Sequence, residues 1–229
     1  KETGFQKWTW YLNEKGADRP SRTIRKRTNE PGGVRVKPGT YKIALHFGDK
    51  MSEQMITVEN DPRLNKSMNS INEVYITSKE IENMSQLSAD AVKQLVESKK
   101  IAAKYQSELK TLDKEKYKDE IKSSKDITKK IDEVLALFLG KEDRRQGLVR
   151  STDPNINGRL SLANRYVRSR QNGITATENR LIEHAKNALQ NGLEKTNTFF
   201  NEEWKAYKNT LETINLSTFK DVKVFSMDK

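Results

Sequence analysis

The chain changes its hydrophobic period near residue 62. About sixty residues with Gly, Pro and strand-like alternation precede about 150 residues whose apolar side chains recur every three or four positions. Strands followed by long helices, without alternation of the two, indicate an α+β fold rather than a parallel βαβ sheet. We therefore expect a small antiparallel β-sandwich-like module at residues 1–62 and a long antiparallel helical bundle at residues 67–229.

The composition excludes several classes of protein. The 229 residues include no cysteine, which rules out a disulfide framework, thiolate chemistry and cysteine-based zinc sites. No stretch approaches the ~18 consecutive apolar residues that a membrane-spanning helix needs. The chain begins at Lys1 in a strand-like pattern, without an initiator Met or a signal peptide. We expect it to be part of a longer polypeptide.

Three strands are predicted in the first module, at residues 5–12, 41–47 and 51–58. Residues 41–47 alternate apolar and polar side chains, as in a strand with one buried face. Gly48-Asp49-Lys50 is typical of a hairpin turn between the second and third strands. Three strands with so many apolar side chains form an incomplete module, because a sandwich needs a second sheet.

Three aromatic residues, Trp8, Trp10 and Tyr11, lie close together in the first predicted strand. Large aromatic side chains are most often part of a sheet core or of an interface between domains, which is the interpretation we favour. The alternative is a sugar-binding platform.

The basic residues are concentrated before the second predicted strand. Residues 19–37 hold seven basic side chains against the single acid Glu30, which accounts for more than half of the net charge of +11. They are Arg19, Arg22, Arg25, Lys26, Arg27, Arg35 and Lys37. Such a loop could contact phosphate, a sulfated glycan or an acidic protein surface, or it could be a solvated surface loop. Nucleic acid is not expected as a partner, because no aromatic side chains alternate with the arginines.

The helical module contains recognisable start and stop signals. Ser67 is a candidate N-cap of the first helix, which Ser88 and its neighbours at 87–90 could interrupt. A second helix is expected to end at Gly140, before an irregular loop at 140–158. A short third helix is expected at about 158–171.

The last long helix is predicted to start at a capping box formed by Thr175 and Glu178. We expect Leu95, Leu135 and Leu211 to face one shared core, and the tail at 214–225 to fold back onto it.

No motif indicates catalysis. His46 lies in a predicted strand and His184 in a predicted helix of the other module, so they are not expected to share a metal ion or a triad. Gly-rich phosphate loops, nucleophile elbows and metal-ligand spacings do not occur. We expect a noncatalytic chain without a metal or a cofactor.

Three segments together resemble a known bacterial family. They are Gly4-Phe5-Gln6-Lys7-Trp8-Thr9-Trp10, Val36-Lys37-Pro38-Gly39-Thr40-Tyr41-Lys42-Ile43 and Ile56-Thr57-Val58-Glu59-Asn60-Asp61-Pro62-Arg63. This arrangement is similar to the C-terminal part of the sortilin-like, sialidase-type β-propeller proteins of Bacteroidetes, which are loosely grouped with glycosyl hydrolases. The chain departs from the family pattern in the long basic insertion at 19–30, and it contains no propeller repeat.

The resemblance implies an immunoglobulin-like sandwich and a helical tail that follow a β-propeller in an extracytoplasmic protein. It implies a noncatalytic interaction or scaffolding segment that packs on the propeller or docks it into an assembly with another subunit. Two alternatives stay open: an accessory module of a glycan- or peptide-processing propeller enzyme, and an anion-binding module that acts through the basic loop at 19–37.

Overall fold

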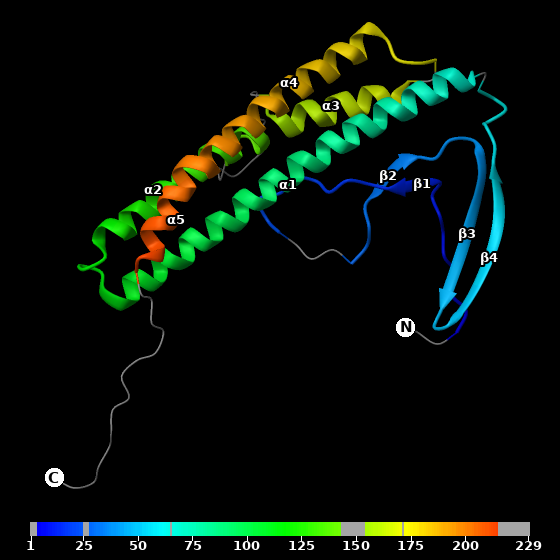
Figure 1. The fold of residues 1–229 in the computed structure, drawn as a ribbon. Helices are drawn as coiled ribbons and strands as arrows, with labels where there is room; N and C mark the ends of the chain where they lie inside the picture. Colours follow the sequence, from blue (N-terminus) through cyan, green and yellow to red (C-terminus); the bar gives the residue numbers. More distant parts are fainter. Residues whose placement is uncertain (1–3, 25–27, 65, 143–153, 171, 215–229) are drawn as a thin grey trace, which may run out of the picture.

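The computed structural model describes residues 4–24, 28–64, 66–142, 154–170 and 172–214. Its described part is α+β, as predicted: two antiparallel two-stranded sheets precede a set of long helices (Figure 1). The predicted tail at 214–225 lies outside the described residues apart from Ile214, and so does most of the predicted loop at 140–158.

The first sheet is short and packs against the longest helix. Strand β1 (Asn13–Lys15) pairs with β2 (Gly32–Arg35), and β2 contacts α1 (Met68–Asp113). The Tyr75 hydroxyl donates a hydrogen bond to Glu14, and Lys79 forms an ion pair with Glu14 at 3.1 Å. The Tyr75 hydrogen bond is the main cause that holds the pKa of Glu14 below its ordinary value. These contacts attach the first sheet to the helical part.

The second sheet is the predicted hairpin. Strand β3 (Gly39–Phe47) pairs with β4 (Lys50–Val58) along its whole length, with Tyr41 opposite Ile56 and Phe47 opposite Lys50. Gly48 in the turn has a φ of 58°, a left-handed conformation that glycine adopts without steric cost. Among the described residues, β3 and β4 pair only with each other.

The strand predicted at residues 5–12 is not formed, and this part of the prediction is wrong. No strand occurs between residues 4 and 12, and the first short strand starts at Asn13. Leu12 has a φ of 57°, which an extended strand cannot accommodate. Just before this turn, the Trp10 indole donates a hydrogen bond to the Asn13 carbonyl at 2.9 Å. Local turn geometry therefore replaces strand pairing.

Helix α1 is continuous over 46 residues, or roughly 70 Å. The Ser67 hydroxyl accepts a hydrogen bond from the Ser70 amide, which confirms the predicted N-cap. The interruption considered at residues 87–90 does not occur. Ser88 and Ala89 are buried, so tertiary packing outweighs the weak local preference of Ser88 for a helix end.

The remaining helices cover α1 in two rows. Helices α2 (Lys118–Leu139) and α3 (Ile156–Ser169) follow one another along α1, and α4 (Ala176–Phe199), the π-helical turn η1 (Phe200–Trp204) and α5 (Lys205–Glu212) run back beside them (Figure 1). This arrangement makes α1 the spine of the helical part.

The core of the helical part is the one predicted from the spacing. Leu95, Leu135 and Leu211 are all buried in the same hydrophobic cluster. The predicted capping box is also present: Glu178 accepts hydrogen bonds from the Thr175 amide at 3.0 Å and from its hydroxyl at 2.5 Å. The core thus lies between helices and does not extend under the hairpin.

Candidate interaction surface

The hairpin places apolar side chains in solvent. Residues opposite one another in an antiparallel pair share a face, so Tyr41, Ile43, Leu45 and Phe47 lie on one face together with Ile56. Leu45 is 57% exposed, and Ile43 and Phe47 are exposed as well. The described part of the chain therefore covers this face only at Tyr41 and Ile56, which are half-buried, and leaves Ile43, Leu45 and Phe47 in solvent.

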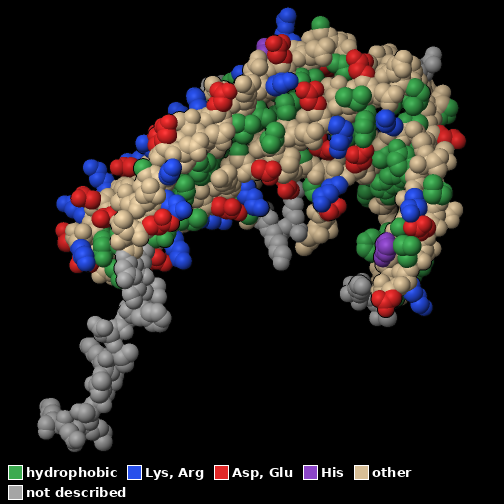
Figure 2. Space-filling view, in the orientation of Figure 1, with side chains coloured by type: hydrophobic (Ala, Val, Ile, Leu, Met, Phe, Trp, Pro, Cys, Tyr) green, Lys and Arg blue, Asp and Glu red, His purple; other side chains and the backbone are tan. Residues whose placement is uncertain are grey.

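The opposite face of the hairpin is mixed. Met51 and Met55 are exposed there, beside an ion pair between Lys42 and Glu53 at 2.9 Å. Figure 2 shows hydrophobic side chains gathered over the hairpin, whereas Lys, Arg, Asp and Glu side chains cover the far end of the helical part. Exposed apolar area is thus concentrated in the β part of the molecule.

The aromatic residues near the N-terminus extend this apolar surface. Trp10 packs edge-on against Tyr41, with the ring centroids 5.7 Å apart, and is half-buried. Trp8 and Tyr11 are 82% and 79% exposed, and Phe5 is 96% exposed. Trp8 and Tyr11 therefore belong to no core formed by the described residues, which corrects the sheet-core interpretation for these two side chains. An interdomain interface and a sugar-binding platform both remain compatible with their exposure.

The seven basic residues singled out in the sequence divide into three sets. Arg19, Arg35 and Lys37 line one groove between the β part and the helices. Arg22 instead donates a hydrogen bond to the Gly140 carbonyl at the end of α2, so it has a structural contact. Arg25, Lys26 and Arg27 lie outside the described residues. The structure thus brings together three of the seven.

The groove also contains residues that the sequence did not single out. It has a volume of about 1120 Å³, and Arg165, Arg168 and Arg170 of the α3 end contribute to its wall. These arginines were missed because they are separated from the basic loop by more than a hundred residues. Arg165 and Arg168 are three residues apart, which places them on one side of a helix. That spacing is the sequence pattern from which they could have been predicted.

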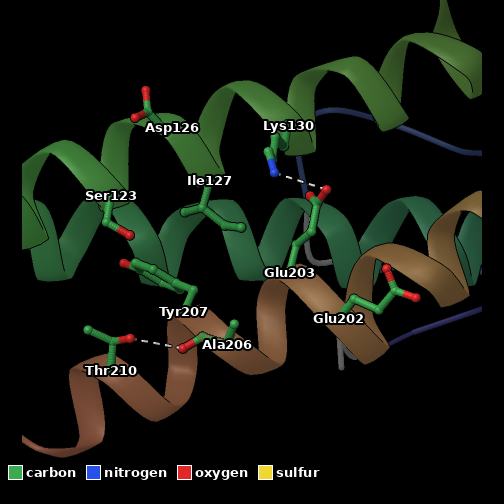
Figure 3. A pocket seen from close by; sticks show the side chains of 9 residues that line it. All are labelled: Ser123, Asp126, Ile127, Lys130, Glu202, Glu203, Ala206, Tyr207 and Thr210. Carbon is green, nitrogen blue, oxygen red and sulfur yellow. Dashed lines mark hydrogen bonds and ion pairs between the residues drawn. The ribbon is translucent and has the colours of Figure 1, made fainter.

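A second concavity lies at the other end of the bundle (Figure 3). It has a volume of about 440 Å³ between α2 and the η1–α5 segment. Lys130 and Glu203 form an ion pair across it at 2.9 Å, and the Tyr207 hydroxyl lies 2.9 Å from the Ser124 hydroxyl. Burial raises the pKa of Tyr207, so its hydroxyl is a poor proton donor at neutral pH.

The two histidines are far apart in the fold, as predicted. His46 is exposed in β3, and His184 is exposed in α4. Among the residues that the structure describes, no group of three or more His, Cys, Asp or Glu side chains has the geometry to hold a metal ion. Within the same residues, no helix is long and apolar enough to cross a membrane.

Glu178 was predicted as a capping residue only, but it also makes the most buried ion pair of the described chain. Its side chain is fully buried, and the Arg170 guanidinium donates to it at 2.6 Å. Arg170 is the main cause that lowers the pKa of Glu178 to about 2, against its ordinary value of 4.5, and the Thr175 hydrogen bonds act in the same direction. This pair joins α3 to α4 beside the groove.

No protein-family model, curated protein or solved structure matches the chain. The exposed apolar surface of the β part and the cationic groove are the two features that a partner could recognise.

Proposed function

We propose that this chain is a noncatalytic interaction segment of an extracytoplasmic β-propeller protein, and that its β part is completed by contact with the propeller or with another subunit. The observation that carries the proposal is the exposure of the hairpin face and of the aromatic residues before it. Exposed apolar patches of this kind mark protein interaction sites on soluble proteins. The resemblance of residues 4–63 to the family supports the choice of partner.

Unpaired strand edges give the same surface a second means of attachment. β3 and β4 each present one edge that no described strand covers, and a two-stranded hairpin is marginally stable by itself in water. Further strands on these edges would extend the sheet, and a second sheet packed on the face of Tyr41, Ile43 and Leu45 would complete an immunoglobulin-like sandwich. The helical bundle, which has a buried core of its own, would then hold this module in position.

The proposal is tested with the chain and the β-propeller domain as separate polypeptides. We expect the propeller to bind the chain and to shift the tryptophan fluorescence to shorter wavelength, because Trp8 would leave water. Ile43→Asp and Leu45→Asp are each expected to weaken binding at least about tenfold, since a charge would be buried in the interface.

The matched control is Leu112→Asp, which introduces the same charge at an exposed leucine of α1 outside the hairpin. It should leave binding unchanged. Equal binding by the hairpin variants and the control, or no binding of the propeller at all, would contradict the proposed function. Binding of a glycan that depends on Trp8 and Tyr11 would instead favour the accessory-module alternative.

A further inference from the structure

A groove between the β part and the helices is the larger of the two concavities described above. Its walls come from segments far apart in the sequence: the loop after β1, strand β2, the end of β4, one side of α1 and one side of α3 (Figure 1). At about 1120 Å³ it exceeds the usual size of a site for one small molecule. An extended ligand suits such a groove better than a compact one.

Positive charge predominates on these walls. Six cationic side chains line the groove without forming an ion pair to any described residue: Arg19, Arg35, Lys37, Lys66, Arg165 and Arg168. Two of the acids on the walls are already neutralised, because Glu82 pairs with Lys79 and Asp61 pairs with Arg63. Cations that share one concavity raise the local concentration of anions and accelerate their association.

The groove also contains acidic side chains, which limit the class of anion that it can bind. Asp18, Glu59, Asp61 and Glu82 lie among the basic side chains. A continuous polyanion such as a nucleic acid would place a phosphate against Glu59, which forms no ion pair with a described residue, and would be repelled there. A ligand with separated negative charges can avoid this carboxylate.

The uncharged residues of the lining also favour a ligand other than a nucleic acid. Aliphatic side chains from the β part and from α1 lie among the charged residues: Leu12, Val34, Val36, Val58, Ile71, Val74 and Ile81. The one aromatic ring in the lining, Tyr75, has Lys37 4.9 Å above its centroid and a hydroxyl bound to Glu14, so it offers no stacking platform. A peptide that carries both carboxylates and aliphatic side chains would cover both kinds of surface.

We propose that this groove binds an acidic, extended polypeptide segment. Carboxylates of the segment would pair with Arg165 and Arg168 on α3 and with Arg35 on β2, and its apolar side chains would pack on the valines of the strands and α1. The proposal does not depend on the hairpin surface, which lies outside the groove apart from Val58 at the end of β4. It gives the chain a second, electrostatic docking site.

The test uses the intact chain and a fluorescent peptide of alternating Glu and Leu, with fluorescence anisotropy as the readout. We expect binding that weakens as salt is raised, because the contacts are ionic. Arg165→Glu and Arg168→Glu should each weaken binding about five- to tenfold. Arg180→Glu on α4, an exposed arginine outside the groove, is the matched control and should change binding less than about twofold.

The thermal unfolding temperature of each variant shows whether weaker peptide binding results from a lost contact or from an unfolded protein. Three results would overturn the proposal: no binding of the peptide, equal loss with Arg180→Glu, or tighter binding of an oligonucleotide or a sulfated glycan at the same arginines. The last result would assign the groove to a polyanion. Ile43→Asp in the hairpin should leave peptide binding unchanged, so failure here and failure of the proposed propeller contact are distinguishable.

Discussion

Arg170 and Glu178 form an ion pair at 2.6 Å that joins the C-terminal end of α3 to the first turn of α4. The Glu178 carboxylate is fully buried, and it also accepts the two capping hydrogen bonds from Thr175. One side chain therefore starts a helix and attaches it to its neighbour. Because the ion pair with Arg170 needs the charged form of Glu178, the stability of this corner depends on pH.

Glu178 should make the protein sensitive to acid. Its pKa is about 2 in the folded protein and near 4.5 when unfolded, so the stabilisation is complete above about pH 4.5 and is lost as the pH falls toward 2. Glu178→Gln can keep the capping hydrogen bonds but not the charge. We expect its deficit in unfolding free energy to be largest at about pH 7 and to shrink below about pH 4.5.

Denaturant unfolding of both proteins across this pH range measures the effect. Glu183→Gln changes an exposed glutamate of the same helix and serves as the control, with wild-type pH dependence expected. A deficit of Glu178→Gln that is constant between about pH 7 and pH 3 would contradict the role of the charge.

Ser88→Ala should stabilise the protein. The Ser88 hydroxyl is fully buried in the middle of α1 and has no hydrogen-bond partner among the described residues. Removing an unsatisfied buried hydroxyl and introducing the best helix former should raise the unfolding free energy by about 1 kcal/mol. Ser124→Ala is the contrast, since it removes the partner of the Tyr207 hydroxyl and should lower stability by about 1 kcal/mol.

Gly33→Ala should loosen the first sheet. A β-carbon at Gly33 would lie 2.6 Å from a carboxylate oxygen of Glu82 and 2.7 Å from the Lys15 carbonyl, and the backbone oxygen cannot move away without displacing β1. We expect a loss of about 1–3 kcal/mol, together with faster amide exchange in β1 and β2. Gly39→Ala meets only the Tyr41 ring, at 3.8 Å, and should change stability by less than about 0.5 kcal/mol.

The shared core of the bundle should respond strongly to truncation. Leu95→Ala, Leu135→Ala and Leu211→Ala are each expected to cost about 2–5 kcal/mol, because each removes a buried side chain from the same cluster. Leu87→Ala, at an exposed position of α1, is the matched control and should cost less than about 0.5 kcal/mol. Similar losses at Leu87 and Leu95 would contradict the helical packing described above.

The helical part was largely predictable because its signals are local. The Ser67 cap, the Thr175 and Glu178 capping box and the stop at Gly140 each depend on residues within one turn of the helix end. The hairpin turn at Gly48 is equally local. The core leucines followed from the three-four spacing, since that period already defines one side of a helix.

The candidate sites were only partly predictable. The basic loop was visible in the sequence. The sequence could not show that Arg22 would bind the Gly140 carbonyl at the end of α2. Nor could it show that the groove would bring together residues of the loop and of α3, namely Arg19, Arg35, Lys37, Arg165 and Arg168. Likewise, the alternation in residues 41–47 indicates a strand with an apolar face but does not state what covers it.

The amino-acid sequence by itself thus determined where the helices begin and end, the hairpin and the apolar side of each helix, because these depend on neighbours along the chain. Only the tertiary structure decided that α1 runs through Ser88 without a break, that residues 5–12 form no strand and that Leu45 faces solvent. Burial and strand pairing depend on contacts between segments distant in sequence, so the free energy that they contribute is gained only in the folded chain.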